Sequence, residues 1–226
     1  MLIRSLWIIM IGFAVTLIFR EELFAIIRAP IAPYLPNNGL VFTAPSDKFV
    51  AYIKVCFLGS VFITCPLWLY QVWLFIAPGL YKHEKRLALY FIFFGSLLFM
   101  SGTVFVYKLI FPMAFKYLLT FGGTVDTPMI TINEYLEFFM MTTLVFGIAF
   151  EMPLILVVLG MMGVIDEKML KSQRRLAVMG LAVLSAVVTP PDAMSMLSLL
   201  LPLLFLYEIS IILVKITKPK PREPIA

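Results

Sequence analysis

The sequence has 226 residues, of which 62% are hydrophobic and 14% are charged, and its mean hydropathy is +1.01. A soluble globule of this size cannot bury so much apolar surface, so the composition predicts an all-α, polytopic integral membrane protein. The net charge of +5 does not indicate nucleic-acid binding, because the lysines and arginines occur in short clusters between apolar runs rather than along one face.

Six apolar runs predict six transmembrane helices in a single membrane domain, at about residues 5–19, 50–77, 87–107, 135–165, 176–188 and 194–214. The first run is short for a span of roughly 20 residues. The fifth gives only about 20 Å of helix against a hydrocarbon core of about 30 Å. We therefore expect the last two helices to form a short hairpin that thins the bilayer or packs against partner helices.

Prolines predict where these helices bend or stop. Pro66 and Pro153 should kink the second and fourth spans, and Pro202 should break the sixth, because proline has no amide donor and crowds the preceding turn. Four prolines between residues 20 and 49, Pro30 among them, restrict that loop to short helical turns.

An even number of spans places both termini on the same side of the membrane. With six spans, that side carries 12 of the 18 lysines and arginines, including those of a basic tail at residues 215–226. By the positive-inside rule we expect both termini in the cytoplasm. On the other side, Lys108 and Lys116 lie among aromatic residues after the third span, which predicts an amphipathic segment at the membrane surface.

The sequence offers no apparatus for catalysis. Cys56 and Cys65 lie nine positions apart in one apolar run, on opposite faces of a helix, so we expect them to pack rather than to form a disulfide with each other. His83 is the single histidine, and there is no CxxC motif, nucleophile–base pair or glycine-rich phosphate loop. We predict no cofactor, no metal and no enzymatic activity, which leaves a carrier, a channel or a docking scaffold.

Glu151 is the residue whose insertion into the membrane costs the most free energy, because it lies near the middle of the fourth apolar run. An acid at the centre of a span costs about 2.5–3.5 kcal/mol on insertion scales, so its side chain must face protein or water. Two alternatives follow. The carboxyl either makes a structural hydrogen bond to a neighbouring helix, or it forms a functional polar site beside the bend at Pro153.

Glu84 lies in a basic loop where the second span leaves the membrane, close to Lys82, Lys85 and Arg86. Its chemistry alone favours a solvated surface acid, where an ion pair contributes only about 0–1 kcal/mol. Gln71, at the end of the preceding span, is able to hydrogen-bond across helices.

Glu84 is also part of a longer pattern, Tyr70-Gln71-x-Trp73-x-Phe75-x-x-Pro78-x-Leu80-Tyr81-x-x-Glu84-Lys85-Arg86. Further segments lie around it in the chain: Arg28-Ala29-Pro30, Phe111-Pro112-x-Ala114-Phe115, Phe146-Gly147-x-x-Phe150-Glu151-x-Pro153 and Thr189-Pro190-Pro191-Asp192. Together, over essentially the whole chain, these segments resemble the TatC family, the receptor subunit of the twin-arginine protein translocase.

This resemblance implies a six-helix, glove-shaped receptor in a bacterial inner membrane that binds the signal peptides of folded cargo, with transport driven by the proton-motive force. Glu84 would be the loop carboxylate that binds the paired arginines, within a site of Gln71, Tyr81, Glu84, Lys85 and Arg86. Glu151 and Pro153 would form an intramembrane polar site on the concave face, where the apolar region of the peptide inserts.

The resemblance also implies single-span partners of the TatA and TatB type, packed against the fifth and sixth spans, and further copies of the chain. Within those spans, the residues expected at the docking site are Thr189, Ser195 and Glu208. Pro30 and Asp192 would lie in the periplasmic loop and turn.

The chain departs from the family pattern at two places. Family members usually begin with His-Leu-x-Glu-Leu-Arg-x-Arg, whose glutamate is a second contact for the arginine pair, whereas this sequence starts Met1-Leu2-Ile3-Arg4. We expect either a truncated start or recognition that rests on Glu84 alone. The glutamine common near the head of the sixth span is replaced here by Ser195-Met196.

Two other classes of function stay open at this point. One is a proton-coupled transporter of small solutes that uses Glu151 as its ion site, and the other is a structural membrane scaffold. The absence of inverted repeats and of a second charge deep in the membrane argues against the transporter. The free energy needed to place Glu151 in the membrane argues against a structural scaffold, because acids inside membrane spans usually have a function.

Overall fold

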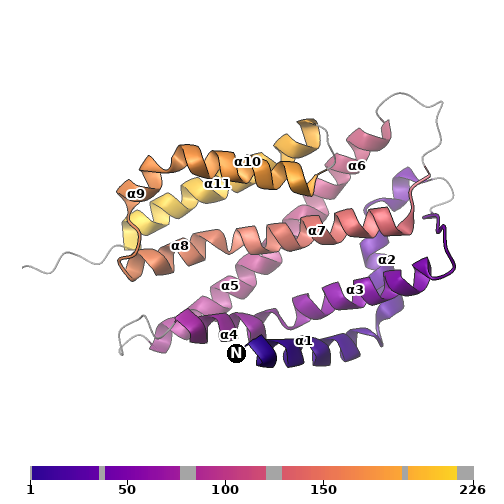
Figure 1. The fold of residues 1–226 in the computed structure, drawn as a ribbon, viewed down its shortest axis with the longest axis horizontal. Helices are drawn as coiled ribbons and strands as arrows, with labels where there is room; N and C mark the ends of the chain where they lie inside the picture. Colours follow the sequence, from indigo (N-terminus) through magenta and orange to yellow (C-terminus); the bar gives the residue numbers. More distant parts are fainter. Residues whose placement is uncertain (1, 36–38, 77–84, 121–128, 190–192, 218–226) are drawn as a thin grey trace, which may run out of the picture.

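The computed structural model describes residues 2–35, 39–76, 85–120, 129–189 and 193–217. Within these ranges the chain is helical, and its β pairing is one isolated bridge between Val41 and Thr131. A 3-10 turn covers Ala32–Tyr34 and a π-helical turn covers Val106–Ile110. The α-helices, shown in Figure 1, are α1 (Leu2–Thr16), α2 (Arg20–Arg28), α3 (Asp47–Ile63), α4 (Cys65–Ile76), α5 (Lys85–Phe105), α6 (Phe111–Thr120), α7 (Ile132–Phe150), α8 (Met152–Met161), α9 (Glu167–Ser172), α10 (Arg174–Val188) and α11 (Ala193–Thr217).

The described helices confirm an all-α membrane protein. Three continuous stretches are long and apolar enough to cross a bilayer, namely Leu89–Leu119, Ile132–Met161 and Ala193–Thr217. The bent pair α3–α4 makes a fourth if it counts as one span. α1 and α10 are apolar but have only 15 residues each, so the crossing of the membrane by six helices stays a prediction.

One of the three predicted proline bends is confirmed, because α3 and α4 meet at an angle of 59° beside Pro66. α7 ends and α8 begins just before Pro153, but the two helices form one continuous stretch, Ile132–Met161, so the bend at Pro153 stays a prediction. The predicted break at Pro202 is wrong, because this residue lies inside a continuous α11 of 25 residues, so the sixth helix is not short. A proline removes one backbone hydrogen bond, and in a long apolar helix the bonds on either side suffice to keep the helix intact.

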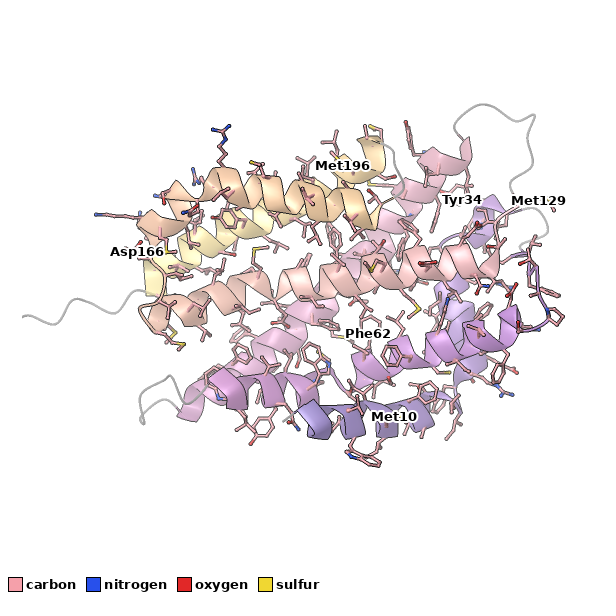
Figure 2. All side chains as sticks on the ribbon, in the orientation of Figure 1. Met10, Tyr34, Phe62, Met129, Asp166 and Met196 are labelled. Atoms are coloured by element: carbon pink, nitrogen blue, oxygen red, sulfur yellow. The ribbon has the colours of Figure 1, made fainter. Side chains whose placement is uncertain are left out.

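The helices run mostly alongside one another, as Figure 1 shows. α7 and α8 cross the middle of the molecule, with α9, α10 and α11 on one side, α1 and α3 on the other, and α5 running diagonally past them. In Figure 2, Asp166 lies at one end of the molecule, and Tyr34 and Met129 lie at the other. Met196, near the head of α11, does not reach as far toward that second end as Tyr34 and Met129 do.

Side-chain caps fix where two helices begin. The hydroxyl oxygen of Thr131 accepts a hydrogen bond from the amide of Glu134 at the start of α7, and this hydroxyl also donates to the Glu134 carboxylate. Asp166 accepts a hydrogen bond from the amide of Met169 at the start of α9. Each cap satisfies an amide that the first turn of a helix leaves without a backbone partner.

Asp47, the first residue of α3, links the segment before α3 to α7, at the end of the molecule where Tyr34 lies. One of its carboxylate oxygens accepts hydrogen bonds from the amides of Thr43 and Ala44 and from the Thr43 hydroxyl. The other oxygen accepts a hydrogen bond of 2.9 Å from the side chain of Asn133 on α7. The amide of Val41 in the same segment donates a hydrogen bond to the carbonyl of Ile130, just before α7, and its carbonyl accepts one from the amide of Ile132, so this link holds α3 and α7 in register.

Asp47→Ala is expected to lower the unfolding temperature of the purified protein by several degrees, because it leaves two loop amides and the Asn133 amide without their acceptor. The unfolding temperature in detergent measures this effect. Asp47→Asn should have a smaller effect, since its carbonyl oxygen still accepts from the loop amides. Equal unfolding temperatures for the wild type and Asp47→Ala would show that the link is not needed for stability.

Candidate functional site

Glu151 lies at the junction between α7 and α8, in the middle of the stretch Ile132–Met161. Its side chain is only 4% exposed. Pro153, also buried, occupies the first turn of α8, where a proline is tolerated because its missing amide would have had no helical partner. Glu151 is therefore a buried acid at a break between two helices, two residues before a proline.

The surroundings of Glu151 leave its carboxylate without a hydrogen-bond partner. Among the residues that the structure describes, none donates a hydrogen bond to either carboxylate oxygen. Gly95 of α5 allows the close approach, since a Cβ atom at this position would lie 3.2 Å from Oε2 of Glu151. The hydroxyl oxygen of the neighbouring Ser96 is likewise buried. An unsatisfied buried acid is costly, so a donor supplied by another molecule would stabilise it.

An apolar cavity of about 80 Å³ lies beside the carboxylate, between α4, α5 and α8. Trp73 of α4 and Phe91 of α5 stack against each other there, with ring centroids 4.8 Å apart. Leu154 of α8 belongs both to this cavity and to the packing around Gly95, so the cavity and Glu151 are adjacent. Since Trp73 is near the end of α4 and Phe91 near the start of α5, the cavity extends from Glu151 toward the ends of the predicted recognition loop.

Part of the predicted arginine-binding site lies outside the described residues, namely Tyr81 and Glu84. Lys85 and Arg86 form the first turn of α5, and the position of their side chains is not described. Gln71 is half-buried on α4. The predicted clamp around Glu84 therefore stays a prediction.

The residues expected at a partner-docking site do not come together. Thr189 ends α10, where its hydroxyl donates to the carbonyl of Ser185, and Ser195 is buried near the head of α11. Glu208 pairs instead with Arg174 at the opposite end of α10, at 2.7 Å. The 15 residues of α10 separate the two places. Of the two outer-loop residues, Pro30 is half-buried just after α2 and Asp192 lies outside the described residues.

The sequence alone reveals neither the role of Gly95 nor the pairing of Trp73 with Phe91. Both depend on which faces of α4, α5 and α8 meet, and an apolar run of nearly uniform hydropathy does not reveal this. The only local signal was a glycine in the middle of a long span, where small residues allow helices to approach closely.

The family model described as "Sec-independent protein translocase protein (TatC)" matches residues 1–202. The chain belongs to the TatC family. Relatives with the name "Sec-independent protein translocase protein TatC" include one from Campylobacter jejuni, 38% identical over 95% of this chain and 89% of the relative. Another, from Aquifex aeolicus, is 37% identical over 98% of this chain and 93% of the relative.

The fold agrees with this membership. A solved structure titled "Crystal Structure of Twin Arginine Translocase Receptor- TatC" superposes with a TM-score of 0.86, at 37% identity, covering 96% of this chain and 95% of that one. As a member of the TatC family, the chain is a component of a Sec-independent protein translocase in a membrane, and it is not an enzyme. The alternative of a proton-coupled solute transporter finds no support in these similarities.

Proposed function

We propose that this protein is the cargo receptor of its translocase and that it binds twin-arginine signal peptides of folded proteins at two connected places. The arginine pair binds at the loop around Glu84. The apolar region that follows packs along α4, α5 and α8 near Glu151, with one of its side chains in the cavity of about 80 Å³ lined by Trp73 and Phe91. The observation that carries this proposal is the buried, unpaired carboxylate of Glu151 beside an apolar cavity that extends toward that loop.

The chemistry of the loop suits an arginine pair. A guanidinium donates two parallel hydrogen bonds to one carboxylate, whereas a lysine ammonium acts as a point charge. Glu84 supplies the carboxylate, and Lys85 and Arg86 would repel a peptide that offers positive charge in any other register. Tyr81 and Gln71 add hydrogen-bonding groups at the membrane surface.

Partner subunits of the single-span TatA and TatB type are proposed to pack on α10 and α11. α10 supports this because it is short and carries exposed apolar side chains along its length, Leu176, Val183 and Val187 among them. Both termini are proposed to lie in the cytoplasm, with further copies of the chain in the assembly and transport driven by the proton-motive force.

The proposal is tested by crosslinking. A photoreactive amino acid at position 83, beside Glu84, is offered a twin-arginine signal peptide and its twin-lysine variant. We expect the arginine peptide to be labelled about tenfold more strongly, which corresponds to a difference of roughly 1.4 kcal/mol in binding. Glu84→Gln should reduce its labelling to the level of the lysine peptide.

Position 168 provides the matched control, because Lys168 lies in another basic segment next to Asp166, at the same end of the molecule as the start of α5. The photoreactive residue there should label neither peptide. Equal labelling of the two peptides from position 83 would contradict the receptor function of the loop.

A further inference from the structure

Another cavity, of about 150 Å³, lies between α2, α3, α5 and α7, on the side of the molecule away from Glu151. Its walls include Leu23 and Ile26 of α2, Val55 and Leu58 of α3, and Phe139 of α7. Phe62 of α3 also lines it, and Figure 2 shows this ring on the side of α3 that faces α7.

The polar groups in the wall are already satisfied. The hydroxyls of Thr103 and Thr143 donate to carbonyls of their own helices, at 3.0 and 2.6 Å. The hydroxyl of Tyr107 donates to the carbonyl of Ile26 at 2.8 Å. None of these three hydroxyls has a hydrogen left to donate to a polar ligand. Apolar cavities of about 150 Å³ stay dry and take a benzene-sized molecule, which is about the size of five or six carbons of an acyl chain.

The cavity opens toward the lipid between α2 and α5. Its floor is closed, because Val55 and Leu58 are at most 1% exposed. Its rim is open, because Ile26 on α2 is 56% exposed and Thr103 on α5 is partly exposed. A bilayer chain thus reaches the floor by passing between these two helices.

Two cations directly follow wall residues in the sequence. The ammonium of Lys108 is 5.9 Å from the centre of the Tyr107 ring, and Tyr107 forms part of the cavity wall. Arg28 directly follows Ile27, another wall residue, at the end of α2. Both cations are exposed, and in the described part of the chain neither pairs with a carboxylate. A phosphate group complements this pair of charges.

We propose that this cavity binds part of an acyl chain of a membrane phospholipid, whose phosphate lies at Lys108 and Arg28. The lipid would hold α2 against the spans in addition to two tyrosines, since Tyr107 and Tyr135 donate hydrogen bonds to the carbonyls of Ile26 and Ile27 at the end of α2. These carbonyls belong to the last turn of the helix, where carbonyl oxygens lack amide donors from the helix itself.

The test uses the full chain in phosphatidylcholine vesicles that contain a phosphatidylglycerol with a diazirine in the first half of one acyl chain. After illumination, mass spectrometry of α3 locates the label. Bound lipid should label the buried residues Val55 and Leu58, which lipid around the outside of the protein cannot reach. Surface lipid labels Ile53 and Phe57 of the same helix, which are 39% and 45% exposed.

Three comparisons complete the experiment. Leu58→Phe, which fills the cavity, should abolish the labelling of Val55 and leave that of Phe57 unchanged. Lys108→Glu, a surface change that does not disturb the core, should lower the labelling of Val55 several-fold, whereas Lys168→Glu should not. A diacylglycerol with the same diazirine should label Val55 weakly, because it lacks the phosphate. Label confined to Ile53 and Phe57, or equal labelling of Val55 by the diacylglycerol, would overturn the proposal.

Discussion

Glu151→Ala is expected to reduce export of a folded twin-arginine cargo by about tenfold to a hundredfold, since a hydrogen bond to a charged group contributes roughly 1.5–3 kcal/mol. The same change should leave the unfolding temperature unchanged or raise it, because it removes a buried carboxylate that has no partner among the described residues. Loss of activity without loss of stability separates a functional acid from a structural one. Export in cells that carry only the variant, together with thermal unfolding of the purified protein, measures both effects.

Two further variants sharpen this prediction. Glu151→Gln keeps one acceptor oxygen and should fold normally, with export between that of the wild type and that of the alanine variant. Glu137→Ala is the matched control, because Glu137 is an exposed acid on the same helix. Peptide labelling from position 83 should persist in Glu151→Ala, since the loop does not depend on this carboxyl. Unchanged export by Glu151→Ala would assign the residue a purely structural role.

The sequence predicted the features that a single residue determines. Pro66 marks a real bend and Pro153 a break between two helices because a missing amide acts locally, and Glu151 is buried because its position in a long apolar run leaves it no route to water. Pro202 was predicted wrongly for a related reason, since a proline weakens a helix without deciding whether the neighbouring turns continue.

The features that depend on two segments could not be predicted. The sequence does not reveal that Gly95 faces Glu151, or that Val41 pairs with the backbone before α7, because these contacts depend on the rotation and register of helices far apart in the chain. For Glu84 the sequence is more informative than the structure. A motif points to that residue strongly, whereas the described residues neither support nor contradict it.

The contact between α5 and α7 leads to the second large effect. Gly147 of α7 lies against Phe99 of α5, and a Cβ atom at this position would lie only 2.6 Å from the ring. Phe99 cannot swing aside, because it is buried against Phe62 and Trp68, with ring centroids 5.5 and 5.4 Å away. Gly147→Ala should therefore destabilise the protein by about 1–3 kcal/mol through overpacking, although alanine is the better helix former.

Gly180→Ala is the matched control, since nothing lies within 4 Å of a Cβ atom at this position on α10. That change should leave the unfolding temperature in detergent unchanged or raise it, because it brings only the gain in helix propensity, up to about 1 kcal/mol. The double variant Gly147→Ala with Phe99→Leu should recover part of the loss, because the smaller side chain makes room for the new methyl group. Equal unfolding temperatures for Gly147→Ala and Gly180→Ala would contradict this prediction. They would show that α5 and α7 are able to separate at this point, so that their close contact is not what holds Glu151 against Gly95.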